Sequence, residues 1–125
     1  METDTYLGGE VEVKKAGGIF YVKLDDGSKA YVATETGSGV VKILETYVPD
    51  KYRGRGYARI LTEKVIEYAR SNNLKILPVC SYAIGYFMKN KELRDILVDE
   101  VKNLSEDEWG RLYEERVREE ARKRA

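Results

Sequence analysis

The chain has 125 residues, so we expect one domain that buries a core without disulfides or metals. Its 22 Lys and Arg balance 22 Asp and Glu, and zero net charge argues against a general nucleic-acid binder, which normally carries a basic excess. With no histidine and one cysteine, Cys80, the sequence excludes imidazole-based catalysis and internal disulfides and argues against a structural zinc site.

The first half of the chain predicts an antiparallel meander. Residues 1–9 are expected to be a loose start that ends in Gly8-Gly9. Four strands then follow, because apolar positions alternate with polar ones and glycine-rich turns separate them: residues 10–14, 19–24, 29–36 and 40–48. Asp26-Gly27 is typical of a tight hairpin turn. The start of the chain has no apolar stretch of the kind a signal peptide or membrane span requires, so a cytoplasmic location is expected.

The second half predicts mainly helices. Residues 57–71 have one apolar face, and residues 74–79 follow as a short buried strand, which together with the preceding strand makes a parallel β-α-β unit. Ser81 is expected to cap a helix through Lys89, residues 91–102 to form another, and Ser105 to Glu108 to open a last helix as a capping box. We therefore predict an α/β fold with a mixed sheet of about five strands, a core over residues 10–98 and a C-terminal helical extension over residues 99–125.

The most informative segment is the glycine loop, residues 53–58, which lies between a strand and an amphipathic helix. Gly54 and Gly56 let the backbone turn tightly and approach a ligand closely. The first amides of the following helix have no partner within it, and Arg53 and Arg55 add positive charge. These features predict a cradle for a phosphate or pyrophosphate; a basic surface turn is the alternative.

Two common nucleotide-binding motifs do not fit the glycine loop. A P-loop needs a Gly-Lys-Ser/Thr ending that is absent here. A dinucleotide fingerprint needs a third glycine where Arg59 stands, and an acidic residue about 20 positions on, which residues 74–79 do not offer.

The glycine loop resembles the acetyl-CoA motif of the GCN5-related N-acetyltransferases, because Arg53, Gly56 and Ala58 follow its spacing. The segments Leu44–Pro49 and Pro78–Tyr82 resemble the small, minimal branch of that family, which has a Thr-x-Val-Pro strand end and a Pro-x-Cys segment. The resemblance covers roughly residues 18–98. This chain departs from the branch at Glu45, where a histidine is usual, and at Ser81, where a proline is usual.

The resemblance implies the acetyltransferase fold, transfer of an acetyl group from acetyl-CoA to an amine, and no metal. The acceptor amine is left open between a protein, a polyamine and a small molecule. The residues expected to bind acetyl-CoA are those of the glycine loop and its neighbours: Tyr47, Val48, Tyr52, Arg53, Gly54, Arg55, Gly56, Tyr57, Ala58 and Lys89.

Three residues are candidates for the chemistry that the resemblance implies. Glu45 is the candidate base for the ammonium proton, with burial against Ile43 and Tyr47 expected; a solvent-facing glutamate is the alternative. Cys80 is either an acyl acceptor or a small buried residue. Tyr86, or Tyr82 one turn earlier, is a candidate proton donor to the leaving thiolate, although both rings also suit core packing.

The C-terminal helix carries an apolar stripe of Trp109, Leu112, Tyr113 and Val117. We expect it to pack on its own domain, with a homodimer contact as the alternative, and Glu120 to pair with Arg124 on its surface. Two other functions therefore stay open: a non-catalytic module that binds CoA or acyl-CoA, and an interaction protein that docks a partner through this helix.

Overall fold

The computed structural model describes residues 2–6 and 9–124, with side chains described from residue 11 onward. Within these residues, six strands form one sheet in the order β1-β2-β3-β4-β5-β6. They are β1 (Glu2–Tyr6), β2 (Gly9–Ala16), β3 (Ile19–Lys23), β4 (Lys29–Gly37), β5 (Val40–Tyr47) and β6 (Lys75–Pro78). The predicted meander is confirmed, because β2 to β5 pair antiparallel in sequence order, and β6 adds to β5 in parallel.

The expectation of a loose start is wrong for Glu2–Tyr6 and Gly9, whereas Met1, Leu7 and Gly8 lie outside the described residues. Strand β1 pairs antiparallel with β2 from Glu2 opposite Val13 to Tyr6 opposite Gly9. The two threonines and one tyrosine of this segment favour extended backbone, and the edge of β2 offers hydrogen-bonding groups that a further strand can satisfy. The sheet is therefore one strand wider than predicted.

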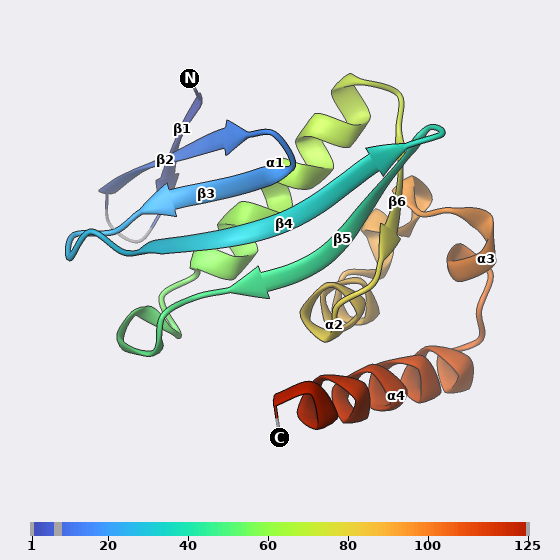
Figure 1. Cartoon of the computed structure of the whole chain (residues 1–125). Helices are drawn as coiled ribbons and strands as arrows, with labels where there is room; N and C mark the ends of the chain where they lie inside the picture. The colour runs from blue at the N-terminus through green and yellow to red at the C-terminus, as the bar shows by residue number, and fades with distance from the viewer. Residues whose placement is uncertain (1, 7–8, 125) are drawn as a thin grey trace.

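Helices cover one face of the sheet (Figure 1). Helix α1 (Tyr57–Ser71) packs on β3 to β6, and α2 (Ser81–Lys89) packs on β5 and β6. Helix α4 (Glu106–Arg124) lies against α2, so the C-terminal helix packs within its own chain as expected. The 3-10 turns η1 (Asp50–Tyr52) and η2 (Lys91–Ile96) and the short α3 (Asp99–Lys102) complete the fold. Strands β3 and β4 cross in front of α1 in Figure 1, so the sheet face toward the viewer is the one without these helices.

The helix predicted over residues 91–102 is wrong, because an extended residue divides it. Leu97 has φ −78° and ψ 154°, is fully buried and forms a parallel bridge with Ile76 of β6. The Val98 amide donates to the Ile76 carbonyl at 3.0 Å. Burial of Leu97 beside the sheet thus outweighs the local preference for helix.

A β-bulge at Leu44 decides which way the end of β5 faces. Thr34 of β4 lies opposite Ile43, whereas Ala33 lies opposite Glu45, so Leu44 is the extra residue. Pairing between β5 and β6 ends at the same place, with Ile43 opposite Pro78. The Val79 and Cys80 amides both donate to the Ile43 carbonyl, at 2.9 and 3.1 Å. We call the opening beyond Ile43 and Pro78 the fork.

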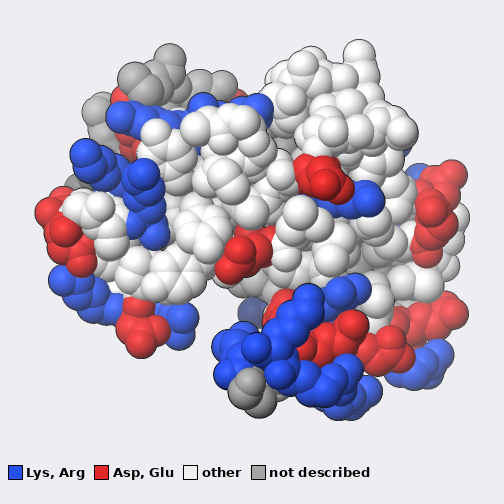
Figure 2. All heavy atoms as spheres, viewed as in Figure 1, with Lys and Arg blue, Asp and Glu red and all other residues white. Residues whose placement is uncertain are grey.

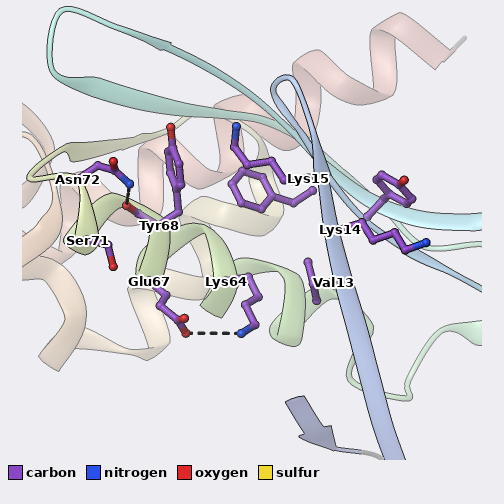
Figure 3. A pocket seen from close by; sticks show the side chains of 10 residues that line it. Val13, Lys14, Lys15, Lys64, Glu67, Tyr68, Ser71 and Asn72 are labelled. Atoms are coloured by element: carbon purple, nitrogen blue, oxygen red, sulfur yellow. Dashed lines mark hydrogen bonds and ion pairs between the residues drawn. The ribbon is translucent and has the colours of Figure 1, made fainter. Parts of the chain in front are cut away.

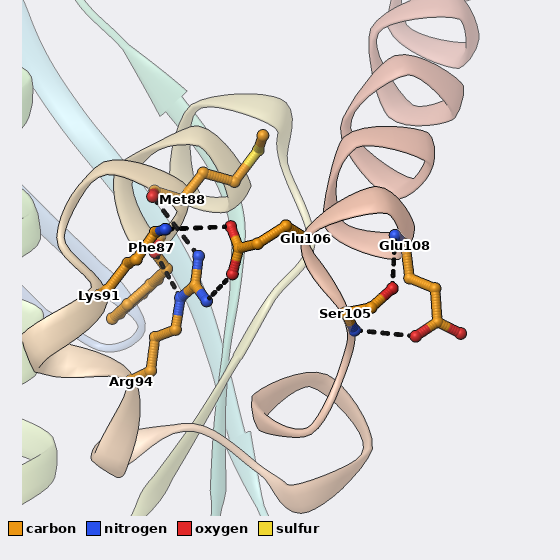
Figure 4. A network of polar contacts seen from close by, with 7 residues as sticks. All are labelled: Phe87, Met88, Lys91, Arg94, Ser105, Glu106 and Glu108. Atoms are coloured by element: carbon orange, nitrogen blue, oxygen red, sulfur yellow. Dashed lines mark hydrogen bonds and ion pairs between the residues drawn. The ribbon is translucent and has the colours of Figure 1, made fainter.

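Helix α4 is anchored by the buried indole of Trp109 and by a polar network. Figure 4 shows the polar network. Trp109 is fully buried, with the Arg94 guanidinium 4.5 Å above its ring. Arg94 also donates to the Phe87 carbonyl at 2.8 Å and pairs with Glu106 at 2.8 Å. The predicted capping box is confirmed: the Glu108 amide donates to Ser105 Oγ at 3.1 Å, and the Ser105 amide donates to Glu108 Oε1 at 2.8 Å. These contacts fix where α4 begins.

The Arg94–Glu106 ion pair should make the attachment of α4 to the domain sensitive to low pH. The hydrogen bond from Arg94 holds the pKa of Glu106 below its usual range. A carboxyl with a lowered folded-state pKa stabilises the fold above its unfolded pKa, about 4.3, and loses that contribution as the pH falls through the folded value. We expect the melting temperature to fall less steeply below pH ~5 in Glu106→Gln than in the wild type. The exposed Glu115→Gln is the control, and parallel curves for Glu106→Gln and wild type would contradict the prediction.

The surface carries charges of both signs. Figure 2 shows basic and acidic side chains interspersed along α4, at the bottom of the view. No helix of the described residues combines the length and the apolar character that crossing a bilayer requires.

Candidate functional site

The glycine loop joins β5 to α1 through two residues in the left-handed region. Gly54 has φ 79° and Gly56 has φ 90°, conformations that side-chain-bearing residues rarely adopt. Gly56 is the N-cap of α1, and no described side chain hydrogen-bonds to this cap. The first amides of α1 therefore remain available to an anion beside the loop, as predicted from the two glycines.

A cleft of about 410 Å³ lies along this loop and extends to the fork. We call it the loop cleft. Its lining combines the end of β5, the loop, the start of α1 and one residue of α2: Thr46, Val48, Tyr52, Arg53, Gly54, Gly56, Tyr57, Ala58, Arg59 and Tyr82. The structure thus brings together seven of the ten residues predicted to bind the ligand. The cleft adds Thr46, Arg59 and Tyr82, and it is not lined by Tyr47, Arg55 or Lys89.

The arginines of the loop are held by neighbouring groups. Arg53 Nε donates to the Val48 carbonyl at 3.0 Å, and its guanidinium pairs with Asp50 at 3.0 Å. The Arg55 guanidinium lies 5.2 Å from the centre of the Tyr52 ring. Because Tyr52 is buried, it gives the Arg55 guanidinium a fixed surface to rest on. The positive charge is therefore organised at the mouth of the loop.

The inner side of the fork holds Cys80. Cys80 is 5% exposed, and its Sγ lies 3.5 Å from Thr46 Oγ1. Cys80, not Ser81 as predicted, is the N-cap residue of α2. The Ser81 amide and hydroxyl instead donate to Glu120 of α4, at 2.9 and 2.5 Å. The carboxylate of Glu120, predicted on the helix surface beside Arg124, thus caps α2 from another helix.

The outer side of the fork holds Glu45. The expectation that Ile43 and Tyr47 bury it is wrong, because the bulge turns Glu45 to the open sheet face, where it is exposed. Tyr47, also exposed, stacks at 5.5 Å on Tyr31 of β4. Burial, and after it the Glu45 carboxylate, raises the pKa of the Tyr31 phenol. Glu45 and Cys80 therefore lie on opposite faces of the same strand end.

The two candidate tyrosines of α2 occupy different places. Tyr82 lines the loop cleft, and burial raises the pKa of its phenol. Tyr86 is 8% exposed and does not line that cleft; burial, with a contribution from Glu63, raises its pKa to about 12. Both tyrosines line a second cavity of about 500 Å³, together with Lys89 of α2 and Tyr113 of α4. We call it the tyrosine cavity.

A larger cavity, about 730 Å³, lies away from these residues, where β2 and β3 meet the C-terminal half of α1 (Figure 3). Its charged groups contact groups of the protein itself: Lys64 lies 3.7 Å from Glu67, and the Lys15 ammonium lies 4.9 Å above the Tyr68 ring. It contains none of the residues predicted to act in chemistry or ligand binding.

The chain is similar to proteins of a known family over a region that includes the glycine loop. A family model described as GCN5-related N-acetyl-transferase matches residues 19–96. The solution NMR structure of a GCN5-like candidate N-acetyltransferase from Staphylococcus aureus is 29% identical, with a TM-score of 0.59 over 70% of this chain and 87% of that chain. No curated protein matches the sequence. The family match includes the glycine loop, Glu45, Cys80 and α2 and ends before α4.

Proposed function

The chain belongs to the GCN5-related N-acetyltransferase family, and we propose that it transfers an acetyl group from acetyl-CoA to an amine in the cytoplasm. The observation that carries the proposal is the loop cleft. Two left-handed glycines and the uncapped start of α1 line one end of it, and Thr46 at the fork lines the other. A ligand with a pyrophosphate and a long arm that ends in a thioester fits that order of groups.

Each part of the loop cleft has a role in holding acetyl-CoA. The amides at the start of α1 and the backbone of Gly54 and Gly56 face the pyrophosphate, and Arg53 and Arg55 balance its charge. Acetyl-CoA supplies the activated acetyl group as a thioester. A backbone amide near Tyr47 or Val48 stabilises the charge that develops on the carbonyl oxygen.

Glu45 accepts the proton that the attacking amine loses. As the amine nitrogen bonds to the carbonyl carbon, the carbon–sulfur bond breaks, and the released thiolate takes up a proton. Burial raises the pKa of both tyrosine phenols, so position rather than acidity distinguishes the two as donors. Tyr82, which lines the loop cleft, is the better placed of the two tyrosines, and solvent is the other source of this proton.

Cys80 supports direct transfer without an acyl-enzyme. The residue is 5% exposed, and its thiol contacts the Thr46 hydroxyl, which is not a base. An acyl acceptor needs a partner that takes its proton and a path for the acyl group. Burial against Thr46 favours the packing role that the sequence left open.

The proposal is tested by measuring acetyl-CoA binding and turnover separately. Calorimetry measures the dissociation constant, and mass spectrometry follows acetylation of a polyamine, a lysine peptide and an aralkylamine. We expect acetyl-CoA to bind and at least one amine to be acetylated. Binding without acetylation of any amine would support the non-catalytic module instead, and absence of binding would overturn both.

A further inference from the structure

The tyrosine cavity lies between three helices, and it has a composition suited to a flat, partly charged ligand. It is bounded by the start of α1, the length of α2 and the middle of α4. Three tyrosines line it, and the rings of Tyr82 and Tyr86 are 6.3 Å apart. Arg59 and Lys89 are the cationic residues of the lining. Its volume of about 500 Å³ falls within the range of small-molecule sites, roughly 300–1,000 Å³.

The tyrosine cavity adjoins the loop cleft. Arg59 and Tyr82 line both, so these two residues lie at the boundary between the two cavities. CoA has three parts: a pantetheine arm, a pyrophosphate and an adenosine 3′-phosphate. When the glycine loop holds the pyrophosphate and the arm points to Thr46, the adenosine end still requires a site.

Helix α4, which lies outside the matched family region, contributes Tyr113 to the lining of this cavity. A Cβ atom on Gly85 of α2 would lie 3.3 Å from Tyr113 Cε1, so the glycine lets the tyrosine come close to α2. The contact of Glu120 with Ser81 and the burial of Trp109 hold α4 on either side of Tyr113. The ring is therefore held in place over the cavity.

We propose that the tyrosine cavity binds the adenosine 3′-phosphate end of CoA and that Tyr113 of the C-terminal helix selects for it. This inference rests on the proposed use of acetyl-CoA and assigns the extension a role in donor recognition. The adenine ring stacks on tyrosine, and Arg59 and Lys89 supply the charge that a 3′-phosphate requires.

The test compares a whole ligand with its truncated form. The dissociation constants of CoA and of 4′-phosphopantetheine, which lacks the adenosine end, are measured by calorimetry for the wild type and Tyr113→Ala. Loss of one base–aromatic stack corresponds to about a 5- to 150-fold loss of affinity. We expect Tyr113→Ala to weaken CoA by about 10-fold within that range and to leave 4′-phosphopantetheine unchanged.

Further variants separate stacking from stability. Tyr113→Phe keeps the ring and should bind CoA like the wild type. Val117→Ala, one turn along α4 and 38% exposed, is the matched control and should change neither affinity. Lys89→Met should narrow the difference in affinity between CoA and 3′-dephospho-CoA.

Four outcomes overturn the inference. Equal weakening of CoA and 4′-phosphopantetheine by Tyr113→Ala would assign α4 a general structural role. Unchanged CoA affinity in that variant, or equal affinity of the wild type for both ligands, would place the adenosine end outside the cavity while the proposed function stands. A wild type that binds neither ligand would overturn the proposed function itself, and this inference with it.

Discussion

Replacing Gly56 by valine is expected to weaken CoA binding by about 100-fold or more. Gly56 has φ 90° at the start of α1, where a β-branched side chain both strains the backbone and fills space beside the free amides. Loss of two hydrogen bonds to a charged group, each worth roughly 1.5–3 kcal/mol, corresponds to at least this factor. Calorimetric titration with CoA measures the effect.

Gly27 provides a matched control for this experiment. It has φ 88° in the hairpin between β3 and β4, and a Cβ there would meet no atom within 4 Å. Gly27→Val therefore introduces the same kind of backbone strain far from the loop cleft. We expect both variants to melt at lower temperature and only Gly56→Val to lose CoA. Equal CoA affinity in the two variants would remove the glycine loop from the site.

Glu45→Gln is expected to slow acetyl transfer by about 10²–10⁴-fold, the usual cost of losing a general base, while CoA affinity stays unchanged. The amide keeps the shape of the side chain and cannot accept the ammonium proton. The loss should shrink at high pH, because a larger share of the amine is then already neutral. Initial rates at saturating acetyl-CoA over a pH series measure both effects.

The control for Glu45 is Glu35→Gln. Glu35 is an exposed carboxylate of neighbouring β4 and pairs with Lys42 at 3.8 Å. Its removal alters charge on the sheet without touching the fork, so turnover should stay at the wild-type rate. If both variants keep that rate, the base lies elsewhere; if both lose it equally, the effect is one of overall charge.

Local patterns were sufficient for the meander, α1 and the glycine loop. Alternation of apolar residues gives strands without reference to distant contacts, and Asp26-Gly27 determines a turn within a few residues. The two loop glycines sit where φ is positive, which is a property of their own backbone. The capping box at Ser105 and Glu108 is equally local, and it formed as predicted.

The predictions that proved wrong concern residues whose positions depend on contacts between distant segments. A strict period of two puts Glu45 on the buried face with Ile43, and only the bulge against β4 moves it to the open face. Leu97 leaves helical geometry because it reaches Ile76, 21 positions earlier in the sequence. Glu120 of α4 accepts a hydrogen bond from Ser81 of α2, a residue on another helix. Periodicity within one segment contains no information about such partners.

The extra residue in β5 has a consequence for how two reactants would meet. Because Leu44 shifts the alternation of the strand, Thr46 faces the helices while Glu45 faces the open sheet surface. In the proposed reaction, the donor enters along the helical side and the acceptor along the bare side, and they share only the gap between β5 and β6. Neither path crosses the other, so the geometry imposes no order of binding, and a ternary complex can assemble from either direction.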